Sequence, residues 1–157
     1  MAGSRRPALS LSVQYADARL KDSLPRTALR KWAQAALQMP AELTIRFVDA
    51  EEGRMLNRDY RDRDYATNVL TFAYGDDVGD DGSGITRADI VLCTDVLQRE
   101  AVERELSLVA HAAHLVVHGV LHAQGYDHEH DQDATEMEQL ETEVLATLGF
   151  PDPYGPR

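Results

Sequence analysis

The sequence predicts an α+β fold, in which a small mixed β-sheet of about four strands is packed with about five helices. Three observations indicate this class. Some segments alternate apolar and polar residues as half-buried strands do, other short runs are apolar and β-branched, and longer segments repeat apolar residues at helical spacing. No internal repeat or linker divides the 157 residues, and 43% of them are hydrophobic. We therefore expect a single domain over residues 1–157 with one core.

The first half of the chain predicts two strands and two helices. Residues 9–15 alternate as a strand, and a helix follows from Pro25 to near Met39, where the next residue is a proline. Residues 43–48 alternate again. Residues 50–60 are predicted as a short helix with Met55 and Leu56 facing inward.

The second half predicts two more strands and three helices. The strands are expected at 69–74 and 89–92, on either side of a polar, glycine-rich loop at 75–84. One helix begins near Asp95, a long apolar helix reaches Ala123, and a last helix runs over 132–148. Residues 1–8 and 151–157 are expected to be loose.

Three histidines mark the end of the central apolar helix as a metal site. His118 and His122 are four residues apart, so on a helix they lie about 6 Å apart along the axis and are rotated by only about 40°. A third ligand on the next turn would lie too far away. Gly125 solves this, because it can adopt a left-handed conformation, end the helix and bring His128 back to the ion.

Two other histidines compete for the same role. His114 and His118 also have ligand spacing, and His130 competes with His128 for the third position. His114 is otherwise a packed residue or one that contacts a ligand imidazole. Asp127 either accepts a hydrogen bond from a ligand imidazole and fixes its tautomer, or stabilises the turn. His111, on the same helix face, is expected to be structural.

Three neutral imidazoles predict one Zn²⁺ per chain with an open coordination position for water, whose pKa such a site lowers to about 7. Other divalent transition metals also accept imidazole ligands. Metzincin peptidases share the spacing of the three histidines and the glycine, but they place a glutamate directly after the first histidine as the general base. Because Gly119 occupies that position, the pattern disfavours a peptidase.

The formal net charge of −11 disfavours a general nucleic-acid binder, since phosphate contacts need lysine and arginine. A local basic strip could still bind RNA on an acidic protein; it consists of Arg46, Arg54, Arg58, Arg61 and Arg63. No apolar run approaches the length of a membrane span, no signal peptide is evident, and the lone Cys93 has no partner in the chain for a disulfide. We expect a cytoplasmic protein without a membrane partner, with Cys93 buried in a strand.

The chain resembles the YbeY family of metal-dependent bacterial endoribonucleases that act in ribosomal RNA maturation. The resemblance extends over about residues 43–150 and is carried by four blocks: residues 56–72, residues 89–93, the motif His118–His128, and Met137-Glu138 with Leu148-Gly149-Phe150. Ala73, Ala88 and Ala123 stand where the family usually has proline, glycine and leucine, and none of them is a proposed ligand. The family pattern includes Tyr126-Asp127-His128, which favours His128 over His130.

The resemblance implies a single-strand-specific endoribonuclease that processes the 3′ end of the small-subunit ribosomal RNA and serves ribosome quality control. Arg61 and His118 are then the expected catalytic residues, with Arg61 binding the phosphate beside the metal. The implied partners are single-stranded RNA, above all ribosomal RNA, and the small ribosomal subunit or its proteins, and no DNA is expected. Two alternatives stay open: a non-catalytic ribosome-assembly factor with a structural zinc, and a hydrolase of another substrate.

Overall fold

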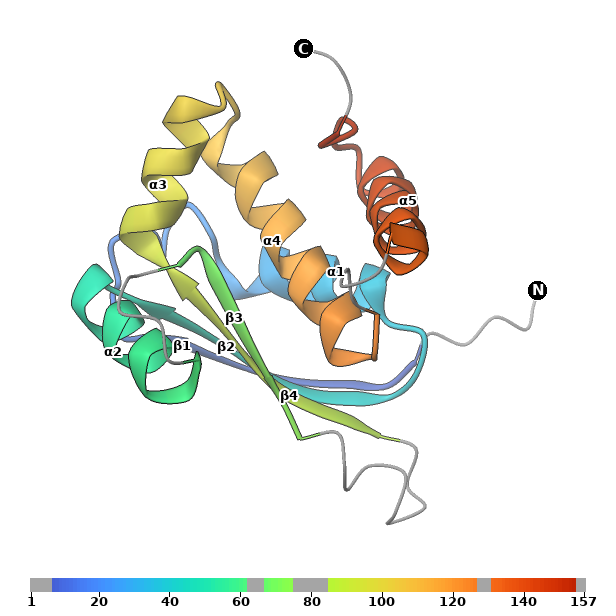
Figure 1. Ribbon diagram of the computed structural model, residues 1–157, viewed down its shortest axis with the longest axis horizontal. Coiled ribbons are helices and arrows are strands. Elements are labelled where there is room, and N and C mark those ends of the chain that lie inside the picture. Colours follow the sequence, from blue (N-terminus) through green and yellow to red (C-terminus); the bar gives the residue numbers. More distant parts are fainter. Residues whose placement is uncertain (1–6, 62–66, 75–84, 127–130, 155–157) are drawn as a thin grey trace.

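The computed structural model describes residues 7–61, 67–74, 85–126 and 131–154, without the side chains of Arg61 and of residues 131–133. These residues form four strands and five helices (Figure 1). In chain order they are β1 (Leu9–Tyr15), α1 (Arg26–Ala36), β2 (Ala41–Val48), α2 (Ala50–Arg61), β3 (Val69–Ala73), β4 (Thr86–Cys93), α3 (Thr94–Glu103), α4 (Leu108–Ala123) and α5 (Asp131–Thr147).

The sheet is mixed, as the sequence predicts, and has the strand order β1-β2-β4-β3. The pairs β1–β2 and β2–β4 are parallel, whereas β3 pairs antiparallel with β4 at the edge. Helices α1, α4 and α5 lie on one side of the sheet and α2 lies on the other (Figure 1). The α+β prediction is therefore confirmed.

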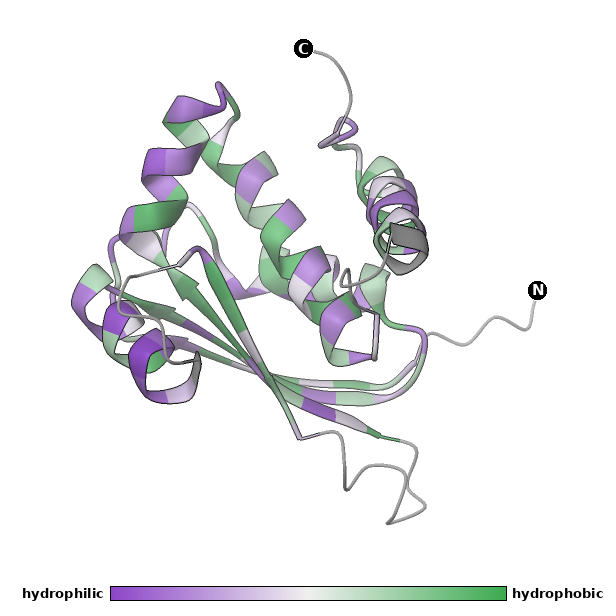
Figure 2. Cartoon of the chain, viewed as in Figure 1, coloured by the Kyte–Doolittle hydropathy of each residue, from purple (hydrophilic) through white to green (hydrophobic). Residues whose placement is uncertain are grey.

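Strand alternation divides the buried side chains between the two faces of the sheet. Ile45 pairs with Ile90 and Phe47 with Leu92 on the face that meets α4, and these side chains belong to the main core. The intervening Val91 belongs to a smaller cluster under α2. Figure 2 shows hydrophobic residues concentrated along the sheet and α4, whereas α2 is largely hydrophilic. Helix α4 is thus the central helix of the fold, packed against β3 and β4 and against α1, α3 and α5.

The predicted elements all form, with shifted ends. The first helix ends at Ala36 rather than near Met39, and β4 begins at Thr86, three residues before the predicted start. One predicted orientation is wrong: Met55 is 45% exposed, and Leu56 alone of the two packs under α2. Asn57 is buried instead, one position further along the helix.

Both chain termini are predicted to be loose from the sequence, but the terminal residues that the structure describes make contacts with the fold. Pro7 O accepts a hydrogen bond from Gln34 Nε2 at 2.7 Å, and the tail is fastened as far as Tyr154, whose hydroxyl donates to Glu141. The predicted loop at 75–84 lies outside the described residues. Within the described part of the chain no single helix is long and apolar enough to span a bilayer; α3 and α4 pass such a test only together, across a bend of 119°.

Candidate metal centre

Helix α4 places two of the predicted ligands side by side. Its first turn is capped by Ser107, whose Oγ accepts a hydrogen bond from Ala110 N at 3.0 Å, and the helix then continues for 16 residues. Near its C-terminal end the rings of His118 and His122 are parallel, with centroids 6.4 Å apart and planes 4° apart. Both imidazoles therefore extend from the same face of the helix.

The turn after α4 has the conformation that the sequence predicts. Gly125 has φ +106°, in the left-handed region. Gly125 N donates to His122 O at 3.0 Å and Tyr126 N donates to Leu121 O at 3.2 Å, the hydrogen-bond pattern of a Schellman motif. The helix thus ends and the chain turns back at the predicted residue. His128, Asp127 and the competing His130 lie outside the described residues, so the third ligand stays a prediction.

The two histidines that the structure describes, His118 and His122, fit a zinc ion. Among the described residues, no three histidine, cysteine, aspartate or glutamate side chains converge as a metal site. The parallel pair supplies two of the three imidazole nitrogens that an open zinc site uses. A third donor would follow Gly125, beyond the described end of the turn.

A buried carboxylate behind the histidines is the feature that sequence reasoning missed. Glu141 on α5 is completely buried, and its Oε2 lies 2.5 Å from His118 Nδ1. Its Oε1 lies 3.3 Å from His114 Nε2 and accepts a hydrogen bond from the Tyr154 hydroxyl. Burial by itself would raise the pKa of Glu141, but the hydrogen bonds from His114, His118 and Tyr154 outweigh burial and lower it to about 2. Glu141 is therefore a charged, acceptor-only group at neutral pH.

His114 is part of this contact network, and its ring lies perpendicular to that of His118, with centroids 6.4 Å apart. Its Nε2 is 3.3 Å from Glu141 Oε1 and 3.3 Å from the Tyr154 hydroxyl. The nitrogen that points out from α4 is thus engaged by α5 and the tail. This geometry favours the second role predicted for His114, that of a residue beside the ligands.

His111 has a structural environment, as expected. Its Nε2 lies 2.9 Å from Glu100 Oε1, and the same oxygen accepts from Asn68 Nδ2 at 3.0 Å. Burial lowers the pKa of His111, and Glu100 offsets this effect only in part. The contacts tie α3, α4 and the residue before β3 together, two turns before His118 on the same face of α4.

Packing explains why a glycine stands where the metzincins have their glutamate. A Cβ at Gly119 would lie 3.0 Å from Ile90 Cγ2 and 3.4 Å from Thr71 Oγ1. Position 119 thus faces the sheet at close range, not the open side of the histidine pair. A glutamate there would be forced into the core and could not reach the site.

Two arginines of the predicted basic strip are paired with neighbouring carboxylates. Arg46 contacts Glu52, with 2.7 Å between Nη2 and Oε2, and Arg58 contacts Asp59, with 3.4 Å between Nε and Oδ1. Arg61 is the last residue of α2, on the face of the sheet opposite α4. The structure does not describe the Arg61 side chain or any part of Arg63. The phosphate-binding role of Arg61 therefore stays a prediction.

A family model described as Endoribonuclease YbeY matches residues 13–149, which is most of the chain. The chain belongs to the endoribonuclease YbeY family. It is 67% identical over 148 residues to a protein of Herminiimonas arsenicoxydans named Endoribonuclease YbeY, covering 93% of this chain and 95% of that protein. A protein of the same name from Paraburkholderia phytofirmans is 55% identical over 155 residues, covering 96% and 99%.

A solved structure supports the fold. The solution structure of TM1509 from Thermotoga maritima has a TM-score of 0.52 and 21% sequence identity, over 94% of this chain and 99% of that one. The family model confirms the YbeY resemblance seen in the sequence, and its match begins at residue 13, further toward the N-terminus than residue 43.

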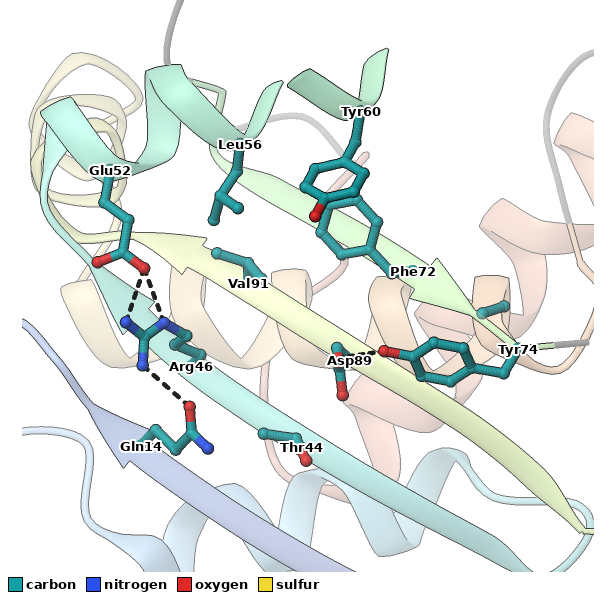
Figure 3. A pocket seen from close by; sticks show the side chains of 11 residues that line it. Gln14, Thr44, Arg46, Glu52, Leu56, Tyr60, Phe72, Tyr74, Asp89 and Val91 are labelled. Atoms are coloured by element: carbon teal, nitrogen blue, oxygen red, sulfur yellow. Dashed lines mark hydrogen bonds and ion pairs between the residues drawn. The ribbon is translucent and has the colours of Figure 1, made fainter. Parts of the chain in front are cut away.

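This YbeY-family chain also has a pocket on the other face of the sheet. It measures about 730 Å³ and lies between α2 and the strands (Figure 3). In its lining, Tyr74 donates a hydrogen bond to Asp89 Oδ2 at 2.5 Å, and Arg46 is held between Glu52 and Gln14. Because Asp89 alternates with Ile90, which faces α4, this pocket and the histidines lie on opposite sides of the sheet.

Proposed function

We propose that this protein is a zinc-dependent, single-strand-specific endoribonuclease that acts in the cytoplasm on ribosomal RNA during maturation of the small ribosomal subunit. The observation that carries this proposal is membership in the endoribonuclease YbeY family over residues 13–149. The paired imidazoles of His118 and His122 support its metal dependence.

The proposal assigns a separate task to each residue. His118, His122 and His128 hold the ion, and the planar guanidinium of Arg61 binds and orients the scissile phosphate. When bound, zinc supplies Lewis-acid activation of water near neutral pH and a positive charge beside the phosphodiester. Because residue 119 is glycine, no glutamate stands directly after His118 in the sequence to take part in proton transfer.

The test is cleavage of a precursor ribosomal RNA fragment by zinc-loaded protein and by His118→Ala protein purified identically. We expect cleavage by the first and none by the second, with matching circular dichroism spectra. Equal cleavage by both would reveal a contaminating nuclease. The binding factor with a structural zinc would then be the better interpretation.

The role of Arg61 has a matched control in Arg58, one turn earlier on α2 and paired with Asp59. Arg61→Ala is expected to reduce cleavage by 100-fold or more, on the order of the loss when a donor to transition-state charge is removed. Arg58→Ala should change it little. Equal effects of the two substitutions would contradict a specific phosphate contact of Arg61.

A further inference from the structure

Glu141 is an unusual residue for the interior of a small protein. Its carboxylate is completely buried between α5 and α4, yet no lysine or arginine pairs with it among the contacts described for it. Placing a charged carboxylate in the interior is costly unless hydrogen bonds compensate for lost hydration. Here the compensating groups are His114, His118 and Tyr154. The carboxylate is therefore built into the fold around the histidines.

The contacts of Glu141 determine where the proton of His118 lies. A carboxylate accepts hydrogen bonds and cannot donate them, so Nδ1 of His118 must carry the hydrogen that lies between it and Oε2, 2.5 Å away. In a neutral imidazole, the other nitrogen then carries the lone pair. The geometry thus selects the tautomer in which Nε2 of His118 is the nitrogen able to bind a cation.

The C-terminal tail holds the far side of the same carboxylate. After Gly149 the chain folds back on α5, where Asp152 Oδ1 accepts from Tyr154 N at 2.8 Å and lies 3.3 Å from Thr142 Oγ1. This turn directs the Tyr154 hydroxyl to Glu141 Oε1. Oε1 is thereby occupied by the tyrosine and His114, while Oε2 is left to His118.

We propose that Glu141 and Tyr154 are positioning residues that act through His118: Glu141 fixes the tautomer and ring orientation of His118, and the tail, through Tyr154, fixes Glu141. The consequence for metal binding rests on the proposed function, in which His118 is a ligand. Carboxylates that accept from a ligand imidazole typically change metal affinity by about 10–100-fold when they are removed.

The experiment compares Glu141→Leu, which removes both acceptor oxygens, with Tyr154→Phe, the control Glu143→Leu and the wild-type 157-residue chain. Glu143 is exposed two residues further along α5, so its substitution removes the same charge from the same helix away from the histidines. Zinc affinity is measured by competition with a chromogenic chelator. The His118 tautomer is measured in metal-free protein by ¹⁵N NMR at mildly alkaline pH, a readout that simple packing defects do not move.

We expect Glu141→Leu to weaken zinc binding by about 10–100-fold and to shift His118 away from the Nδ1–H tautomer. Tyr154→Phe should cause smaller changes in the same direction, and Glu143→Leu should behave as wild type. Wild-type affinity and an unchanged tautomer in folded Glu141→Leu would overturn the proposal. If that variant does not fold, Tyr154→Phe decides in the same way.

The proposal and the function on which it rests fail differently. A wild-type chain that binds no zinc would overturn the metal-dependent function, while the tautomer in metal-free protein would still support or overturn the role of Glu141. Zinc binding that depends on Glu141 without any cleavage of RNA would support the positioning network and overturn the nuclease assignment.

Discussion

Gly119 lies where α4 touches the sheet, and replacing it with alanine tests whether packing excludes a side chain there. The added Cβ would lie 3.0 Å from Ile90 Cγ2, whereas carbon atoms pack best at about 3.5–4.0 Å. Ile90 is completely buried and β-branched, so it has little freedom to move away. Gly53 is the matched control, because a Cβ there meets Cys93 Sγ at an ordinary 3.4 Å.

The expected magnitude follows from two opposing terms. Alanine is favoured over glycine inside a helix by about 0.8–1.0 kcal/mol, and this gain applies to both positions. Overpacking a filled core costs about 1–3 kcal/mol, and this cost applies only to Gly119. Gly119→Ala should therefore lower the free energy of unfolding by up to about 2 kcal/mol, whereas Gly53→Ala should raise it by up to about 1 kcal/mol.

Thermal and urea unfolding of the metal-free variants measure the difference. In a chain of this size each kcal/mol shifts the melting temperature by about 2–4 °C, so Gly119→Ala should melt several degrees below Gly53→Ala. Gly119→Glu should be far less stable still, because it buries a carboxylate against the sheet. If Gly119→Ala melts at or above Gly53→Ala, close approach to the sheet is not what excludes a side chain at this position.

Three further predictions concern the turn, the pH dependence and the metal. Gly125→Ala should cost about 1–2 kcal/mol of stability and weaken zinc binding, because alanine is strained at φ +106°. The control Gly149→Ala, at φ +88°, should cost as much stability but affect zinc binding less. The pKa values of His111 and Glu100 are both lowered in the folded protein, so the unfolded chain binds more protons. The free energy of unfolding should therefore fall as the pH drops below about 6.5. If His111→Gln left the dependence of this free energy on pH unchanged near that value, the prediction would be contradicted. Zinc at about 100 times its dissociation constant should stabilise the wild type by about 2.7 kcal/mol, and a similar rise in the melting temperature of His122→Ala would argue against His122 as a ligand.

Local signals were sufficient for the secondary structure and for one end of the site. The alternation at 9–15 and the apolar spacing up to Ala123 depend on neighbours in sequence, and the structure has elements there. The left-handed turn at Gly125 was predictable for the same reason. Met55 was misplaced because it and Leu56 both fit a helical stripe, and only packing against the sheet decides which of them faces inward.

The network behind His118 was not predictable from local pattern. Glu141 is one of 27 acidic residues, and its spacing of four residues from both Met137 and Leu145 places it on the apolar stripe of α5, but that spacing does not show which groups its carboxylate meets. Its burial depends on α5 lying along α4, and the role of Tyr154 depends on a tail that turn residues alone predict to be loose. Both are contacts between segments more than ten residues apart, for which a single sequence carries no signal of its own.

The charge distribution constrains how such a protein can recognise RNA. A chain with a net charge of −11 gains little from general attraction to a phosphate backbone, and Arg46 and Arg58 are already held by neighbouring carboxylates. Under the proposed function, phosphate recognition would depend on the ion and on Arg61, so few phosphates would be contacted at once. Affinity would depend on the conformation of the strand at those contacts more than on its length. Such a site would favour a flexible single strand that can bend toward the end of α4. A rigid duplex would need many weak phosphate contacts, which an acidic protein does not supply.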